Sequence, residues 1–162
     1  MRVIFYHGLE STPNGSKPHA LRAVFPDLEV PDFTGMAYSE RYAKAKADLA
    51  AGEPALLIGS SLGGLLAVEL ADNYPDKVKG YLLLAPALHM LTNYISNIPT
   101  VAMMVLGRND ETEGLNTAAA TFANENDINC LVVEDGHRLG NSAALMLSMA
   151  TACHKAAAKS VS

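Results

Sequence analysis

Residues 55–64 read ALLIGSSLGG, and this stretch decides the expected fold. The apolar run 55–58 is typical of a strand buried on both faces, and a helical pattern begins at Leu62. Between them, Gly59, Ser61 and Gly63 match the Gly-x-Ser-x-Gly pattern. Small residues two positions either side of a serine allow a sharp strand-to-helix turn that lifts the hydroxyl above the sheet. The pattern therefore predicts a nucleophile at Ser61.

The spacing of the glycines identifies Ser61, rather than the adjacent Ser60, as the serine of the motif. If Ser60 were the nucleophile, Ile58 and Leu62 would occupy the two positions that must be small. A phosphate-binding glycine loop is the other reading of a glycine-rich turn, but neither Gly-x-Gly-x-x-Gly nor Gly-Lys-Ser/Thr is present. An incidental serine in a glycine-rich turn is the remaining alternative.

Short β-rich apolar runs alternate with longer helical patterns on both sides of this turn, which indicates βαβ units and a parallel sheet. We expect a single α/β domain over residues 1–162, with about six mostly parallel strands and helices on both faces. The expected strands are Arg2–Tyr6, Leu28–Phe33, Ala55–Gly59, Val78–Leu84, Thr100–Leu106 and Asn129–Glu134. The expected helices are His19–Phe25, Tyr38–Ala51, Leu62–Asn73, Leu115–Asn124 and a final one ending near Lys159.

Composition narrows the class of protein. The 162 residues are 49% hydrophobic and 18% charged, with a formal net charge of −5 and no Lys/Arg cluster, which argues against a nucleic-acid partner. No apolar stretch is long enough to span a bilayer, and no signal region precedes the first strand, so we expect a cytoplasmic protein without a membrane partner. Cys130 and Cys153 lack metal-binding spacing, and we expect neither a metal nor a cofactor. The sequence says nothing about oligomeric state.

A serine nucleophile needs a base, and on this fold the order along the chain is serine, acid, histidine. His137 satisfies that order, because it lies in EDGHRLG (134–140) just after the last expected strand, where sites form in open α/β sheets. The other four histidines precede the serine, precede the acid or lie deep in the final helix; they are His7, His19, His89 and His154.

The acid is expected at the end of the preceding strand, in LGRNDE (106–111). Asp110 is preferred, Glu111 is the second candidate and Asp135 a distant third. An acid in the triad would hold the tautomer of His137 and stabilise its imidazolium. The competing role for Asp110 is to cap the helix that follows.

The oxyanion hole requires two backbone donors. We expect the amide of Leu62, the residue after the nucleophile, and the amide of Leu9 in the loop after the first strand. In that reading His7 braces the loop and Gly8 borders the substrate. The region 87–98 is expected to act as a small lid, with apolar side chains that face either the site or the core. These side chains are Leu88, Met90, Leu91, Tyr94 and Ile98, and simple core packing is the alternative role for them.

The segments HGLESTP (7–13), SK (16–17), LIGSSLGG (57–64) and APA (85–87) resemble the small bacterial esterases of the YqiA/YcfP type, the UPF0227 group. The resemblance covers nearly the whole chain and implies a minimal α/β-hydrolase without a large cap domain. It implies carboxylesterase activity on short acyl esters, with thioesters also proposed, and it places the family's nucleophile, acid and histidine at Ser61, Asp110 and His137. The chain departs from the family where Arg138 and Leu139 follow the histidine instead of an aromatic residue.

Three functions follow as hypotheses. The first is a carboxylesterase that acts through an acyl-enzyme on Ser61 with a small-molecule ester as substrate. The second is an acyl-CoA thioesterase or amidase on the same triad. Arg108 and Arg138, near the expected mouth of the site, suit an anionic substrate, but solvation at the surface is the preferred explanation for both. The third is a catalytically silent binding protein with a hydrolase fold, since a triad in sequence is not a triad in space.

Overall fold

A computed structural model describes residues 1–160 and shows a parallel sheet of five strands in the order β1-β2-β3-β4-β5. The strands are β1 (Arg2–Tyr6), β2 (Ala55–Ser60), β3 (Val78–Leu84), β4 (Val101–Gly107) and β5 (Asn129–Val133). The helices are α1 (Ser16–Leu21), α2 (Tyr38–Ala51), α3 (Leu62–Asn73), α4 (Leu115–Glu125) and α5 (Ala143–Lys159), with a 3-10 helix η1 over Leu88–Met90.

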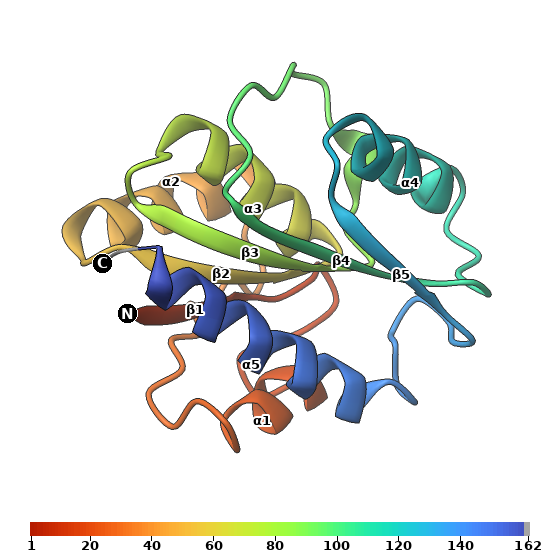
Figure 1. The fold of residues 1–162 in the computed structure, drawn as a ribbon, viewed down its shortest axis with the longest axis horizontal. Helices are drawn as coiled ribbons and strands as arrows, with labels where there is room; N and C mark the ends of the chain where they lie inside the picture. Colours follow the sequence, from red (N-terminus) through yellow and green to blue (C-terminus); the bar gives the residue numbers. More distant parts are fainter. Residues whose placement is uncertain (161–162) are drawn as a thin grey trace.

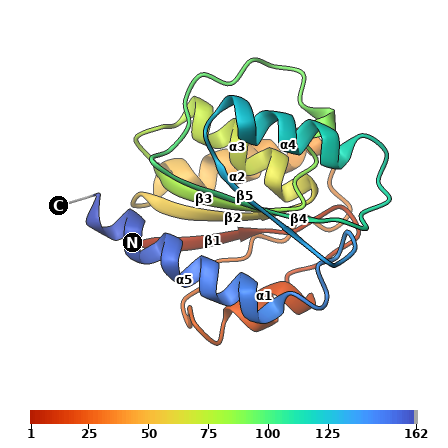
Figure 2. The same ribbon diagram turned by 45° about the vertical axis from the view of Figure 1, so that its right-hand side comes forward.

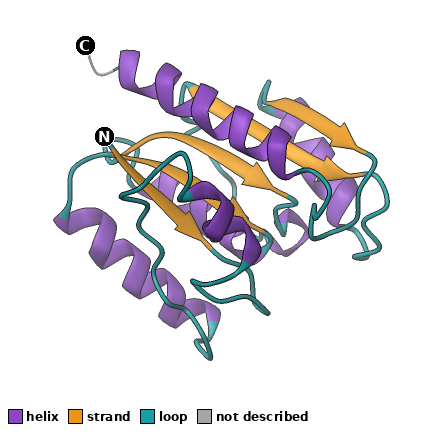
Figure 3. Ribbon diagram, turned by 90° about the horizontal axis from the view of Figure 1, so that it is seen from below, coloured by secondary structure: helices purple, strands orange, loops and turns teal. Residues whose placement is uncertain are grey.

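Helices cover both faces of the sheet, as expected from the sequence. Figures 1 and 2 show α2, α3 and α4 on one face and α1 and α5 on the other. Right-handed crossovers that always step to the next strand place their helices on a single face, which accounts for α2, α3 and α4. The chain reaches the opposite face only before α2 and after the last strand. Figure 3 shows α5 lying across the strands on that face with α1 beside it.

The strand that carries the Gly-x-Ser-x-Gly turn is the centre of the core. Every residue of β2 is buried, because α3 packs on one face of it and α5 on the other. A strand covered on both faces reads as a continuous apolar run rather than an alternating one, which is why 55–58 contains no polar residue. The turn after β2 therefore follows the one strand of the described sheet whose residues are all buried.

The sheet has five strands, not six, because Leu28–Phe33 forms only a single parallel bridge. Glu29 pairs with Ile4 of β1, through Phe5 N to Glu29 O at 2.8 Å and Glu29 N to Val3 O at 3.0 Å. The ladder stops there, since Pro31 has no N–H to donate and the N–H of Phe33 donates to a histidine side chain instead. The segment still lies beside β1 at the edge of the sheet.

Helix α1 begins three residues earlier than the sequence predicts and ends at Leu21 rather than Phe25. Pro18 lies in its first turn, where a missing N–H costs no intrahelical bond, so the helix can start before the proline rather than after it. Across residues 1–160, no helix is both long and apolar enough to cross a membrane.

Candidate active site

Parallel strands bring distant segments of the chain to one edge of the sheet. The carboxyl ends of β1, β2, β4 and β5 open into loops at this edge, which is where ligands bind in open α/β sheets. Residues separated by as many as 121 positions therefore meet here, and the site is built largely from these loops.

Ser61 sits on a strained turn between β2 and α3. Its backbone has φ 53° and ψ −116°, a conformation that residues other than glycine rarely adopt. The surroundings hold it in place: Ser61 N donates to Leu84 O at 3.0 Å, and Ser61 O accepts from Gly64 N and Ala87 N, both at 2.9 Å. These bonds compensate the strain and keep the hydroxyl pointing out of the sheet.

The two glycines of the motif are required by close approach of backbone segments. A Cβ on Gly59 would lie 2.3 Å from Gly63 O, and a Cβ on Gly63 would lie 2.0 Å from Tyr6 O. No side chain fits at either distance. The first turn of α3 can therefore press against β1 and β2 only because both positions are glycine.

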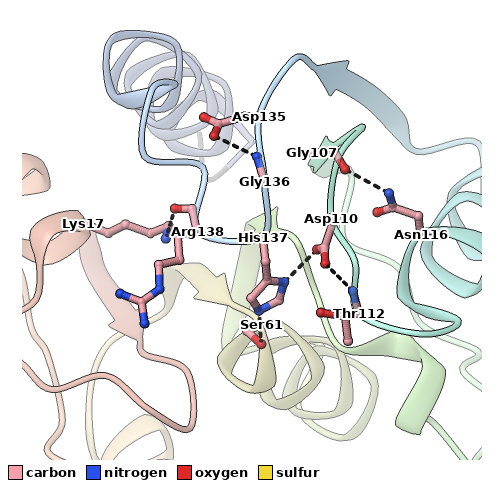
Figure 4. A network of polar contacts seen from close by, with 10 residues as sticks. All are labelled: Lys17, Ser61, Gly107, Asp110, Thr112, Asn116, Asp135, Gly136, His137 and Arg138. Atoms are coloured by element: carbon pink, nitrogen blue, oxygen red, sulfur yellow. Dashed lines mark hydrogen bonds and ion pairs between the residues drawn. The ribbon is translucent and has the colours of Figure 1, made fainter.

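Ser61, His137 and Asp110 lie in hydrogen-bond contact (Figure 4). His137 Nε2 lies 3.0 Å from Ser61 Oγ, and His137 Nδ1 lies 2.7 Å from Asp110 Oδ2. Because the carboxylate only accepts, Nδ1 carries the proton and donates it, which leaves the lone pair of Nε2 facing the serine hydroxyl. The three residues that the sequence singled out thus meet in one array.

The Asp110 carboxylate is completely buried and well satisfied. Its other oxygen accepts a hydrogen bond from Thr112 N at 2.9 Å. Burial opposes ionisation, but the hydrogen bonds from His137 and Thr112 outweigh it, so the pKa of Asp110 lies below its ordinary value. The alternative roles do not apply: Glu111 is exposed, and the residue that precedes α4 is Gly114, so Asp110 does not cap that helix.

Asp135, the third candidate for the acid, holds the histidine loop instead. Its carboxylate accepts three hydrogen bonds of 2.8 Å each, from Gly136 N, Asn141 N and Ser142 Oγ. The hydrogen bond from Ser142, followed by those from the two backbone amides, lowers the pKa of Asp135. The loop that carries His137 is closed around this carboxylate.

His7 braces the loop after β1, as the sequence predicts. Its ring is fully buried; Nε2 accepts from Phe33 N at 3.0 Å, which leaves Nδ1 to donate to Gly8 O at 2.9 Å. Burial lowers the pKa of His7. The neutral tautomer assigned by these two bonds ties the loop to the segment that follows the single bridge.

Arg41 supports the same loop and was not singled out from the sequence. Arg41 is only 1% exposed. Its guanidinium donates to three backbone carbonyls of the loop, His7 O at 3.2 Å, Gly8 O at 3.4 Å and Leu9 O at 3.5 Å. The signal in the sequence was periodicity: Arg41 falls in the buried stripe of α2 with Ala45 and Leu49, at positions i, i+4 and i+8.

The two expected oxyanion donors come from different parts of the chain, Leu9 from the loop after β1 and Leu62 from the start of α3. Within residues 1–160, the amides of Leu9 and Leu62 donate to no protein acceptor. Leu62 is the first residue of α3, where backbone N–H groups have no partner inside the helix. Leu9 lies in the loop that His7 and Arg41 hold, and it borders the cavity beside Ser61.

A cavity of about 520 Å³ opens beside Ser61 and His137. Gly8 lines it as expected, but Leu88 and Tyr94 do not, so their assignment as substrate-binding residues is wrong. Leu88 is 4% exposed in the core beside α3 and α4, whereas Tyr94 is 89% exposed. Lys17 and Thr112 line the cavity without having been predicted, because neither the short helix α1 nor a loop carries a periodic signal.

The lid expected over residues 87–98 is also wrong, because none of these residues lines the cavity. Asp72 Oδ1, near the end of α3, accepts from Ser96 N and Asn97 N at 2.8 Å each. Asp72 lies ten residues beyond the start of α3, about 15 Å along the helix from the serine turn. The far end of the segment, around Ser96 and Asn97, is thus fastened away from the cavity.

Within residues 1–160, no group of three or more His, Cys, Asp or Glu side chains is placed to hold a metal ion. Cys130 and Cys153 are free thiols. Burial raises the pKa of both, to about 11 for Cys153.

Similar structures share this fold. A hydrolase of the alpha/beta superfamily from Xanthomonas campestris pv. campestris has a TM-score of 0.78 at 23% identity, covering 91% of this chain and 94% of its own. A structure from work on the metagenome-derived lipolytic enzymes LipS and LipT has a TM-score of 0.73 at 17% identity, covering 94% and 93%. A thioesterase domain from the curacin biosynthetic pathway has a TM-score of 0.65 at 16% identity, covering 91% and 89%.

These identities establish the fold alone. No match is found among curated proteins. A family model described as "Serine aminopeptidase, S33" matches residues 30–131, more than half of the chain, including the serine turn and Asp110. The chain therefore belongs to this family of α/β-hydrolases.

Proposed function

We propose that this protein is a serine hydrolase that cleaves small carboxylic esters through an acyl-enzyme on Ser61. The observation that carries the proposal is the pair of contacts made by His137, 3.0 Å from Ser61 Oγ and 2.7 Å from Asp110 Oδ2. A nucleophile in contact with a base, and that base oriented by a buried carboxylate, is the arrangement that activates a serine hydroxyl.

In the acylation step, Ser61 Oγ attacks the ester carbonyl and its proton passes to His137 Nε2. The carbonyl π electrons move to oxygen, and the amides of Leu9 and Leu62 stabilise that oxyanion. Collapse of the tetrahedral intermediate breaks the bond to the alcohol oxygen, which takes the proton from Nε2. Asp110 stabilises the imidazolium between the two transfers and keeps the proton on Nδ1.

Deacylation repeats these steps with water. His137 Nε2 removes a proton from a water molecule, whose oxygen attacks the acyl-enzyme carbonyl. The new intermediate releases Ser61 Oγ, which recovers its proton from Nε2. The products are the carboxylic acid and a regenerated hydroxyl, so the cycle needs neither a metal nor a redox partner.

The substrates that we propose are esters of small acids. A cavity of about 520 Å³ lies within the range of small-molecule sites. The resemblance to the YqiA/YcfP-type esterases supports the same substrate class, since a minimal core without a large cap leaves the serine accessible to small substrates.

The test is turnover of p-nitrophenyl acetate and butyrate by the native protein and by Ser61→Ala. We expect the variant to lose at least about three orders of magnitude in kcat while keeping its circular dichroism spectrum. Equal rates would reject the proposal. Labelling of the native protein by a fluorophosphonate probe, prevented in Ser61→Ala, distinguishes an active serine from a silent hydrolase fold.

Thioester or amide hydrolysis on the same triad is the second candidate. The family description favours amides, and the likeness to a thioesterase domain favours thioesters. The leaving group differs but the acyl-enzyme is shared, so the triad does not choose between them. Parallel kcat/KM values for a butyrate ester, butyryl-CoA and an aminoacyl p-nitroanilide rank the three substrate classes directly.

A further inference from the structure

The cavity beside Ser61 has two cationic side chains in its wall. Lys17 comes from α1 and Arg138 from the loop after β5, and both line the cavity together with Ser61 and His137. Figure 4 shows Lys17 and Arg138 on one side of the Ser61–His137 pair, while Asp110 lies on the other. The acyl transfer proposed above uses neither cation.

The Lys17 ammonium is half-buried and only partly satisfied. Nζ donates to Arg138 O at 2.5 Å, whereas an ammonium has three donors. Burial lowers the pKa of Lys17, and the neighbouring Arg138 charge lowers it further. Asp135 is a weaker, opposing influence, and its carboxylate already accepts three hydrogen bonds from its own loop. An anion in the cavity would restore the hydrogen bonds and the charge balance of Lys17.

The Arg138 guanidinium is exposed and has all its donors available. It forms no hydrogen bond or ion pair with any acceptor in residues 1–160. Arg108, the other arginine that the sequence placed near the site, is different: its Nε lies 2.9 Å from Glu134 Oε1, and it does not line the cavity. Of the two, only Arg138 is positioned to contact a substrate.

One carboxylate opposes these cations. Among the described residues that line the cavity, Glu10 is the only acidic one, and it pairs with neither Lys17 nor Arg138. The cavity wall therefore carries one positive charge in excess, on a chain whose formal net charge is −5. The positive wall is a local feature, because the protein as a whole repels anions.

We infer that the cavity selects substrates with an anionic group, a carboxylate or a phosphate, a few bonds from the scissile carbonyl, held by Lys17 and Arg138. This inference rests on the proposed ester hydrolysis at Ser61. Carboxylate and phosphate oxygens accept charge-assisted hydrogen bonds, and both cations have donors to spare. The anion can belong to the acyl group or to the alcohol, and the two sources are separable by experiment.

The experiment compares charged substrates with neutral ones of matched length. Monoethyl glutarate against ethyl pentanoate places the carboxylate on the acyl side; 3-(butanoyloxy)propanoate against propyl butanoate places it on the alcohol side. Acid release is followed in a pH-stat, and the readout is the ratio of kcat/KM for the charged to the neutral member. We expect a ratio of about ten or more for one pair, because charge-assisted bonds discriminate by about an order of magnitude.

Three variants test which residues produce that ratio. Arg138→Gln and Lys17→Met should each lower it about tenfold, and Glu10→Gln should raise it, since it removes the opposing charge. Arg108→Gln is the matched control, because it makes the same chemical change outside the cavity and should leave the ratio unaltered. Raising the ionic strength should reduce the native ratio. Removing Lys17 could shift the His137 loop and lower kcat for both substrates of a pair. The ratio is unaffected by such a shared loss, because it enters both of its terms equally.

The outcomes separate the two proposals. A native ratio near one for both pairs, or a ratio that Arg138→Gln and Lys17→Met leave unchanged, overturns the anionic site while ester hydrolysis stands. Absence of turnover for all four esters, with no difference from Ser61→Ala, overturns the proposed hydrolysis. In that case calorimetry of monoethyl glutarate and ethyl pentanoate binding to Ser61→Ala still tests the subsite. Equal affinities would reject it.

Discussion

His137 Nδ1 lies 2.7 Å from Asp110 Oδ2, and the Asp110 side chain is fully buried while 35% of the His137 side chain is exposed. The Asp110 side of the pair is therefore shielded from solvent, whereas the His137 side is accessible. The buried carboxylate can neither move nor exchange its partner for water, so it sets the tautomer of the imidazole. The accessible end leaves Nε2 facing Ser61 and the cavity.

Asp110→Asn should leave the fold intact and remove most of the activity. The asparagine amide can donate to Nδ1, which would move the imidazole proton to Nε2 and leave the serine without a base. We expect kcat to fall by about 10³- to 10⁴-fold with KM little changed. Glu111→Gln is the control, because that carboxylate is exposed and should contribute nothing. If Glu111→Gln caused the larger loss, the acid would have been misassigned.

Arg41→Met should impair both stability and catalysis. The substitution keeps the length of the stem but removes the donors to His7 O, Gly8 O and Leu9 O. His7 O would lose its side-chain donor, whereas Gly8 O keeps the hydrogen bond from His7 Nδ1 and Leu9 is exposed. One unsatisfied buried carbonyl costs about 1–3 kcal/mol, so the unfolding free energy in urea should fall by about that amount. The loosened loop misplaces the Leu9 amide, so kcat should fall more than KM rises. Lys44→Met, on the exposed side of α2, should change neither quantity.

Gly63→Ala should destabilise the serine turn severely. Alanine is the better helix former by about 1 kcal/mol, but its Cβ would lie 2.0 Å from Tyr6 O. The turn must shift to relieve this contact, and we expect a loss of about 3 kcal/mol or more together with loss of fluorophosphonate labelling. Gly140→Ala adds the same methyl group where no atom lies within 4 Å and should be tolerated. A fully active Gly63→Ala protein would contradict the close packing described for α3.

Asp135→Asn should give a stability loss that depends on pH. The folded pKa of Asp135 lies below its ordinary value, so the ionised form stabilises the fold above about pH 4, and this contribution disappears as pH falls through the folded pKa. Urea unfolding should therefore show native and variant proteins differing at neutral pH and converging in acid. The control is Asp76→Asn, an exposed residue whose carboxylate accepts no hydrogen bond within residues 1–160. A constant difference across pH would contradict the proposed role of the charge.

The sequence alone determined the parallel α/β sheet and the position of Ser61. Both are encoded locally: a doubly buried strand must be continuously apolar, and a sharp strand-to-helix turn must have glycines at fixed offsets. Chain order then selected His137, because the ends of parallel strands share one edge of the sheet. Such rules need no knowledge of which side chains touch.

Only the tertiary structure decided the remaining assignments. Asp110, Glu111 and Asp135 all follow strands at the same edge, and burial together with hydrogen-bond geometry distinguished the hydrogen-bond partner of His137 from the residue that holds the loop. The lid over 87–98 was wrong because Asp72, distant in sequence, holds its Ser96–Asn97 end away from the cavity. Lys17 and Arg138 are 121 residues apart, and their meeting in one cavity wall depends on a contact between the short helix α1 and a loop, neither of which has a periodic pattern in the sequence.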